Sequence, residues 1–313
     1  MYIAPYWHRH RMNEAGEPDS DGMMTAFGWS FTSEAEARDH ALQRAQNIRM
    51  RLSLRDELVE IDEDFERWRA ATPKAVRDQV DWIGDFPCEY YGGARPVREP
   101  IEETHGDAAQ PWALITRNRY GALVINTAKA MFVDIDLPAP PRDRRSIWQR
   151  LVLRMPPPKP VDPGPILARA RQVVEQTPGM GMRLYRTAAG FRGLVTHRTY
   201  VPDSDEAMAQ LKALGTDPLF VRLCKAQRCF RARITPKPWR IAMSAPPDNW
   251  FPYQTKPIRQ QHWQQWLAEY QQRSVDTAVC EPLEHLGVPG VHPDVAPVLA
   301  LHDERALGHG RLV

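Results

Sequence analysis

The segment from residue 112 to residue 240 constrains the fold most, because its strand-like and helix-like stretches follow one another in a readable order. Period-two alternation of apolar residues predicts strands, and apolar residues three and four apart predict helices. The predicted elements are strands over 113–126 and 129–137, a helix over 164–177, a strand pair around 188–190, a helix over 205–215 and a strand over 229–236. The order β-β-α-β-β-α-β favours an α+β fold, with an antiparallel sheet covered by helices on one face.

Three regions can be separated along the chain. Residues 1–111 form a predicted N-terminal α/β unit, with a strand over 23–32 and a helix opened by a capping box at Ser33 and Glu36. Residues 112–240 are the predicted core. Residues 241–313 are predicted to be mainly helical, with the clearest helices at 262–273 and 295–307.

The predicted core contains a hairpin connection and a long Pro-rich connection. The first two strands are predicted to form a hairpin across Asn126 and Thr127. The Pro-rich stretch 138–165 is an insertion, too long for an ordinary connection, which suggests a mobile or functional segment.

Composition predicts a globular protein, and its cysteines lead us to expect a cytoplasmic one. A hydrophobic content of 42% with 26% charged residues is ordinary for such proteins. No apolar run approaches the roughly 20 residues needed to cross a bilayer, and the N-terminus has no apolar stretch of signal-peptide length. The cysteines are too few and too scattered for a disulfide framework, and we expect reduced, buried thiols: Cys88, Cys224, Cys229 and Cys280.

Charge is balanced over the chain but not along it. Lys and Arg number 41 against 39 Asp and Glu, which leaves a net charge of +2. Residues 216–240 carry one acid, Asp217, among seven basic residues: Arg222, Lys225, Arg228, Arg231, Arg233, Lys237 and Arg240. A basic surface near acidic residues suits a phosphate-bearing ligand, although charge alone favours a solvated basic face.

The sharpest local signal is an acid pair in a predicted strand. Alternation places Asp134 and Asp136 on one face and Val133, Ile135 and Leu137 on the other. Two carboxylates this close repel each other unless a cation or a proton intervenes. An all-oxygen site of this kind suits Mg²⁺ or Mn²⁺, whose remaining positions can take phosphate oxygens. A solvent-facing strand end is the alternative.

Two neighbouring features strengthen the metal and phosphate hypothesis. The turn from Thr187 to Gly190 is built of small residues, so phosphate can approach the backbone there, and Arg192 follows with a forked set of donors. Further along, Asp217 supplies a third acid ahead of the basic segment.

These residues, in this order, give residues 120–240 a resemblance to the archaeo-eukaryotic primase (primase-polymerase) superfamily. Members carry two acids on a strand, then a helix, a small-residue turn leading to a nucleotide-contacting histidine, and a later acid followed by basic residues. Asp134 and Asp136 match the acid pair, and Thr187 to Gly190 match the turn. The remaining matches are the third acid and the basic group: Asp217, Arg231, Arg233 and Lys237.

The resemblance implies an RRM-like sheet and a metal-dependent nucleotidyltransferase acting on nucleotides and DNA or RNA. Asp134, Asp136 and Asp217 would be its metal ligands, for Mg²⁺ or Mn²⁺. The chain departs from the family pattern at Arg192, where a histidine is expected; the nearest histidine, His197, lies five residues further on. A divergent transferase, a non-catalytic nucleic-acid-binding protein and a metal-dependent nuclease therefore remain open.

The other candidate residues carry less weight. His302 and Asp303 lie in an apolar helix without a second ligand pair, which favours capping or a salt bridge over a metal dyad. Trp239, beside Lys237 and Arg240, is the one tryptophan whose neighbours suggest base stacking.

Overall fold

The structure is a computed structural model that describes residues 1–12, 24–53, 96–137, 162–247, 251–253, 257–308 and 310–313. Cys88 and most of the Pro-rich insertion lie outside these residues. Contacts divide the chain into two compact units, one formed by Tyr2–Ile101 with Trp250–Lys256 and the other by Met1, Glu102–Asn249 and Pro257–Val313. The predicted core and most of the predicted C-terminal region therefore belong to the same unit.

The smaller unit contains an antiparallel hairpin and a helix. Strands β1 (Tyr6–Met12) and β2 (Met24–Ser30) pair along their whole length, and α1 (Glu34–Ser53) packs against them. Ser33 Oγ accepts a hydrogen bond from the Glu36 amide at 3.2 Å, which confirms half of the predicted capping box. The other half differs, because the Ser33 amide donates to Ser30 Oγ and the Glu36 carboxylate accepts from Ser30 and Thr32. Gly28 faces the helix, where any Cβ would meet the backbone of Ala37 and Ala41.

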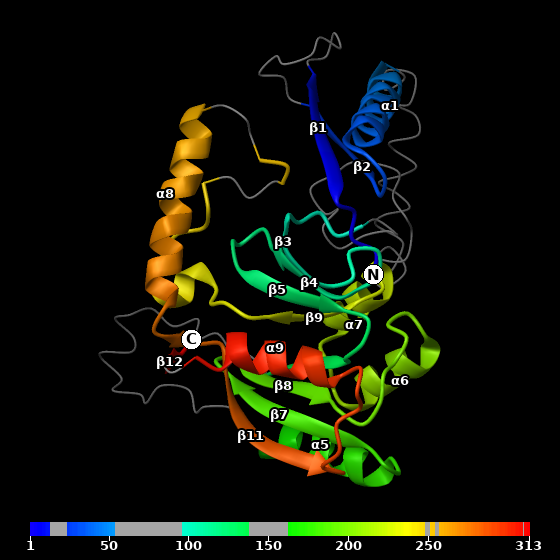
Figure 1. Cartoon of the computed structure of the whole chain (residues 1–313), viewed down its shortest axis with the longest axis vertical. Coiled ribbons are helices and arrows are strands. Elements are labelled where there is room, and N and C mark those ends of the chain that lie inside the picture. The colour runs from blue at the N-terminus through cyan, green and yellow to red at the C-terminus, as the bar shows by residue number, and fades with distance from the viewer. Residues whose placement is uncertain (13–23, 54–95, 138–161, 248–250, 254–256, 309) are drawn as a thin grey trace, which may run out of the picture. The chain divides into compact units, whose positions relative to one another are not determined.

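The larger unit is built on two four-stranded sheets, so the α+β class is confirmed (Figure 1). One sheet has the order β11-β7-β8-β6 and the other the order β3-β4-β5-β9. The strands of the first are β6 (Phe132–Asp136), β7 (Gly181–Thr187), β8 (Gly190–Val195) and β11 (Cys280–Gly287). Those of the second are β3 (Ile101–Gly106), β4 (Pro111–Arg117), β5 (Leu123–Thr127) and β9 (Phe230–Arg233).

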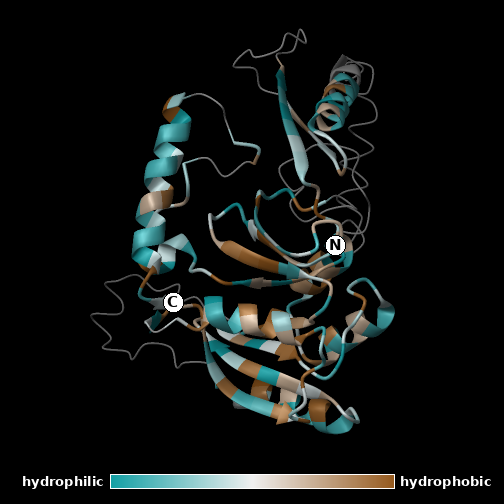
Figure 2. Cartoon of the chain, viewed as in Figure 1, coloured by the Kyte–Doolittle hydropathy of each residue, from teal (hydrophilic) through white to brown (hydrophobic). Residues whose placement is uncertain are grey.

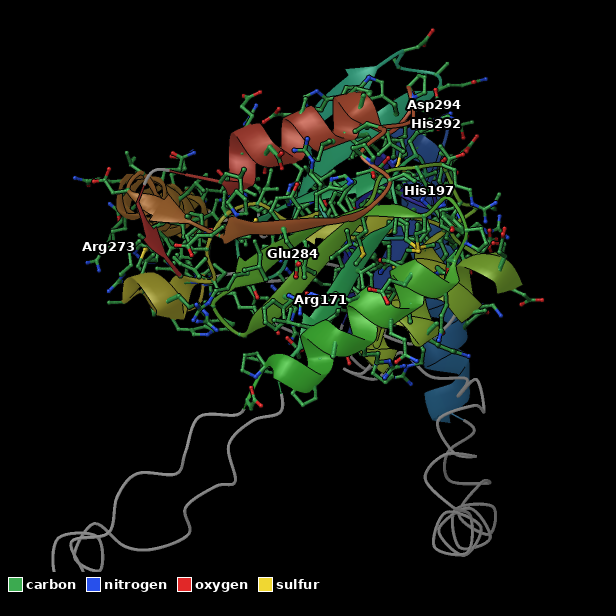
Figure 3. All side chains as sticks on the ribbon, turned by 90° about the horizontal axis from the view of Figure 1, so that it is seen from below. Arg171, His197, Arg273, Glu284, His292 and Asp294 are labelled. Atoms are coloured by element: carbon green, nitrogen blue, oxygen red, sulfur yellow. The ribbon has the colours of Figure 1, made fainter. Side chains whose placement is uncertain are left out.

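Helices cover both faces of the β6 sheet, and not one face as predicted. Arg169 of helix α5 (Gly164–Gln176) donates to the last two carbonyls of helix α6 (Asp205–Ala213), those of Lys212 and Ala213, and so joins the two helices. An ion pair of 2.8 Å joins Arg171 of α5 to Glu284 of β11 (Figure 3). Helix α9 (Ala296–Ala306) lies on the opposite face, where the His302 ring contacts that of Tyr185.

The predicted hairpin across Asn126 and Thr127 is wrong. The stretch 113–126 is itself the hairpin, because it turns at Asn118, whose side-chain oxygen accepts from the amides of Tyr120 and Ala122. Strands β5 and β6 then enter different sheets. Asn126 is fully buried, with its amide donating to β4 and to β5 itself, so it is a strand residue and not a turn residue.

The last strand of the predicted core also pairs differently from the expectation. Strand β9 hydrogen-bonds to β5, not within the β6 sheet, although it lies next to β6 in space. The fourth strand of the β6 sheet is β11, from the C-terminal region that was expected to be mainly helical. Pro282 weakens the strand pattern there, and it is tolerated because β11 is an edge strand with an irregularity beside it.

The remaining C-terminal elements form a second small core. Helix α8 (Pro257–Ser274) is mainly hydrophilic (Figure 2), but it buries Trp266 and Tyr270 against Ile241 and Met243. Two short strands, β10 (Thr277–Ala278) and β12 (Arg311–Leu312), pair in parallel beside it. None of the described helices is long and apolar enough to cross a membrane.

Candidate functional site

The acid pair lies on β6 as the alternation predicts. Asp134 is half-buried and Asp136 is exposed, while Val133 and Ile135 between and beside them are buried. Asp134 is directly opposite Arg192 on β8, and directly opposed residues share one face of a sheet. Both carboxylates and the Arg192 side chain therefore lie on the face that α9 covers.

Asp217 comes to the same place through its backbone. Its amide donates to the carbonyl of Asp134 at 2.9 Å, although the two residues are far apart in sequence. Its carboxylate caps helix α7 (Pro218–Gln227), accepting from the amides of Leu219 at 3.3 Å and Phe220 at 3.2 Å. Helix α7 was missed in the sequence, although an Asp followed by Pro is a signal for a helix start.

Asp136 lies within electrostatic range of both Asp134 and Asp217. Partial burial raises its pKa, and the negative charges of Asp134 and Asp217 raise it further, against smaller opposing effects of Lys237 and Arg233. A raised pKa means that the ionised form is disfavoured by its surroundings. Bound Mg²⁺ or Mn²⁺ would relieve this repulsion, so the chemistry of the donor set fits a hard cation.

Positive groups surround the acids. Burial lowers the pKa of Arg233 to about 10, with repulsion from Arg192 adding to the effect and Asp134 opposing it. Burial also lowers the pKa of Lys237, again with a contribution from Arg233 and an opposing one from Asp136. Each base therefore lies within electrostatic range of both an acid and another base.

The acids and bases of this cluster do not pair directly. No described residue forms an ion pair within 4.0 Å with Asp134, Asp136 or Asp217. A structural salt-bridge centre would show such contacts, because neutralisation is what it provides. The carboxylates therefore keep oxygen lone pairs that the described residues do not use.

The other predicted phosphate-binding residues are distributed around this point. Thr187 and Gly190 end β7 and begin β8, with Gly190 opposite Asp136. A Cβ at Gly190 would lie 2.0 Å from the Ile135 carbonyl, so the glycine lets β6 approach the turn. Arg231 shares one face of β9 with Arg233, but its guanidinium donates to Gln227 at 3.0 Å.

A buried polar network holds Arg192. Its Nη1 lies 3.2 Å from His302 Nε2, and His302 Nδ1 lies 2.9 Å from an Asp303 oxygen. Asp303 also accepts from the Tyr185 hydroxyl at 2.7 Å and from Arg183 at 2.9 Å. The salt-bridge interpretation of the His302–Asp303 pair is thus confirmed in part, since the two residues hydrogen-bond to each other and Asp303 pairs with Arg183.

The protonation of His302 follows from its neighbours. Burial, reinforced by the Arg192 charge, lowers the pKa of His302 to about 4, although Asp303 opposes the shift. A neutral imidazole has one donor and one acceptor nitrogen, and arginine can only donate. Nε2 therefore accepts from Arg192 and Nδ1–H donates to Asp303, which fixes the position of the guanidinium.

Cys280 completes the surroundings of His302 but not a catalytic triad. Its Sγ lies 3.8 Å from His302 Nε2, an arrangement that resembles a cysteine–histidine–acid triad. Burial raises the pKa of this fully buried thiol, and a nucleophile needs a thiolate and access to substrate. Cys280 is a structural thiol, as are the buried Cys224 and Cys229.

Two variants of Asp217 separate its capping from its charge. Asp217→Ala should lower the free energy of unfolding by about 1 kcal/mol, because two amides of α7 lose their acceptor. Asp217→Ser should lower it by only a few tenths of a kcal/mol, since serine is a good cap. Urea unfolding measures both; equal losses in the two variants would show that the cap is not the stabilising feature.

Asp136→Asn should stabilise the metal-free protein at neutral pH. A carboxyl whose pKa is raised by folding stabilises the native state at acid pH, and this contribution is lost as the pH rises through the folded pKa. With EDTA present, the melting temperature of Asp136→Asn at pH 7 should therefore exceed that of the wild type, by no more than about 3 °C because the group is exposed. The difference in melting temperature between Asp136→Asn and the wild type should disappear below the ordinary pKa of 3.8. An Asp136→Asn protein less stable than the wild type at pH 7 would contradict the repulsion of Asp136 by Asp134 and Asp217.

Comparison with protein-family models, with curated proteins and with solved structures finds no match to this chain. Among the described residues, no three His, Cys, Asp or Glu side chains are already arranged as a metal site.

Proposed function

We propose that the chain is a metal-dependent nucleotidyltransferase that resembles primase-polymerases and acts on nucleotides and nucleic acid. The observation that supports this most is that Asp217 lies beside the acid pair Asp134 and Asp136. Asp217 reaches the acid pair only through the fold, and its charge and that of Asp134 both raise the pKa of Asp136. None of these acids has an ion-pair partner among the described residues.

The three carboxylates would hold Mg²⁺ or Mn²⁺. Asp217 can do so while it caps α7, because an ionised carboxylate has about four acceptor positions and two are used. When bound, such an ion neutralises phosphate charge and activates a hydroxyl for attack. A bound cation would favour the ionised form of Asp136, because its attraction for the carboxylate would outweigh the repulsion from Asp134 and Asp217.

The basic residues would bind the phosphates of the incoming nucleotide. Arg192 is buried and held by His302, so it supplies positive charge at a fixed position opposite Asp134. Arg233 and Lys237 approach from β9 and the segment after it, and both are within range of the acids. Preorganised positive groups of this kind stabilise the charge that develops in phosphoryl transfer.

A non-catalytic nucleic-acid-binding protein would use the same basic residues. In that case the acids should be neutralised by direct contact with the bases, and the described residues show no such contact. A metal-dependent nuclease would need the same ligands, with water as the attacking group in place of a hydroxyl.

The test is extension of a labelled primer on a template, with Mg²⁺ or Mn²⁺ and with ribo- or deoxynucleoside triphosphates. The proposal predicts longer products that require both metal and triphosphate and that vanish with EDTA. Unchanged primer under every condition would favour the binding protein, and shortened primer would favour the nuclease.

A further inference from the structure

Trp239 lies on the surface of the larger unit with its ring open to solvent. Its side chain is 53% exposed, whereas Trp266 in the same unit is 8% exposed. It belongs to the short 3-10 helix η2 (Pro238–Ile241), which follows β9 and Lys237. A tryptophan that is half exposed leaves part of its ring available to a ligand.

A second aromatic ring meets Trp239 from a distant part of the chain. The rings of Tyr120 and Trp239 are 5.4 Å apart and perpendicular, at 89°. Tyr120 lies in the β4–β5 turn, which Asn118 closes through two hydrogen bonds. Trp266 packs beneath this turn, where a Cβ at Gly121 would approach its ring to 2.3 Å. Both rings are therefore held by ordered segments.

Cations flank both rings. The Arg119 guanidinium lies 4.9 Å from the centre of the Tyr120 ring and donates to the Tyr120 hydroxyl at 2.8 Å. Lys237 Nζ lies 5.4 Å from the centre of the Trp239 ring. The charges of Asp136 and Asp134 also act on Lys237, so this lysine connects the aromatic pair to the acid cluster.

We infer that Trp239, supported edge-on by Tyr120, forms a stacking platform for a base of single-stranded nucleic acid, with Lys237 and Arg119 contacting the adjoining phosphates. Aromatic rings interleaved with cations suit such a strand, because every base has a face to stack and every linkage carries a negative charge. The inference rests on the proposed function in one respect: only if the chain is a transferase does the stacked base lie beside the reacting nucleotide.

The test measures binding of a fluorescently labelled single-stranded oligothymidylate at low salt, with EDTA and without triphosphate. Trp239→Ala should weaken binding roughly tenfold or more, as expected for the loss of one stacked base. Trp239→Phe should retain most of the affinity, because the ring persists. Val275→Ala is the matched control: this residue is 74% exposed in the same unit and should bind as the wild type does.

An abasic nucleotide placed at successive positions of the oligonucleotide sharpens the result. One position should weaken binding to the wild type and leave binding to Trp239→Ala unchanged. The inference is overturned if Trp239→Ala binds like the wild type, as it would if the rings dock a protein instead, or if the wild type binds no single strand at low salt. Failure of the proposed function is a separate outcome, because a protein that binds through Trp239 and extends no primer would keep the platform and lose the transferase.

Discussion

Asp134→Asn is expected to reduce metal-dependent nucleotide incorporation by at least about a thousandfold. A bound ion contributes several kcal/mol to stabilising the transition state, and each ~1.4 kcal/mol is a factor of ten in rate. Asparagine keeps the shape of the side chain but loses the charge that a hard cation requires. The fold should tolerate the change, because Asp134 has no ion-pair partner among the described residues and its backbone carbonyl still accepts from Asp217.

Asp294→Asn provides the matched control for this experiment. Asp294 is exposed and forms a surface ion pair with Lys129 at 3.2 Å, so its loss should change incorporation by less than about twofold. Initial rates of primer extension in Mg²⁺, with melting curves for each variant, make the comparison. An Asp134→Asn protein that is folded and extends primers at the rate of the wild type would remove the acid pair from the chemistry.

His302→Ala is expected to lower the free energy of unfolding by about 3 kcal/mol or more. His302 is fully buried, and its ring contacts those of Phe132 and Tyr185. Removing it leaves a cavity and deprives buried Arg192 and Asp303 of hydrogen bonds. Urea unfolding at pH 7 measures the loss. His262→Ala, an exposed histidine on α8, should stay within about 0.5 kcal/mol of the wild type.

The loss of stability caused by His302→Ala should depend on pH. The pKa of His302 is lower in the folded protein than its ordinary 6.5, so its contribution to stability is full above that value and is lost as the pH falls towards about 4. The difference between wild type and His302→Ala should therefore narrow over this range. A difference that is small at pH 7, or one that widens in acid, would contradict the buried, neutral state of His302.

Local patterns in the sequence predicted most of the elements correctly. Alternation identified β6, and apolar spacing identified α5 and α6, where Ser204 caps the helix through a 3.1 Å hydrogen bond. The strand pair around the turn after Thr187 is confirmed by the register of β7 and β8. These features depend on residues close in sequence, which is why short windows show them.

Features that depend on distant partners were missed or misplaced. Asn126 has the composition of a turn residue, and only its buried contacts with β4 show that it is a strand residue. The pairing of β11 with β7 could not be read from an eight-residue strand containing proline. Helix α7 was missed because the segment 216–240 was interpreted by its basic charge and not by the spacing of its apolar residues.

The candidate site shows the same division. The residues of the acid pair were identified from alternation alone, and the bond between Asp217 and Asp134 brings the third acid to them. The role of His302 as the partner of Arg192 was not foreseen, because the two residues are 110 positions apart in the sequence and meet only when α9 packs on β8. The family resemblance grouped Arg231 with Arg233, and the guanidinium of Arg231 contacts Gln227.

The most direct test of the central claim is the binding of Mn²⁺, followed by electron paramagnetic resonance, with a non-hydrolysable nucleoside triphosphate present. The free-ion signal should fall on addition of the wild-type protein, as one or two ions bind among Asp134, Asp136 and Asp217. The double variant Asp134→Asn, Asp136→Asn should leave the signal at the level given by the triphosphate alone. Equal binding by the wild type and the double variant would show that these acids do not hold the metal.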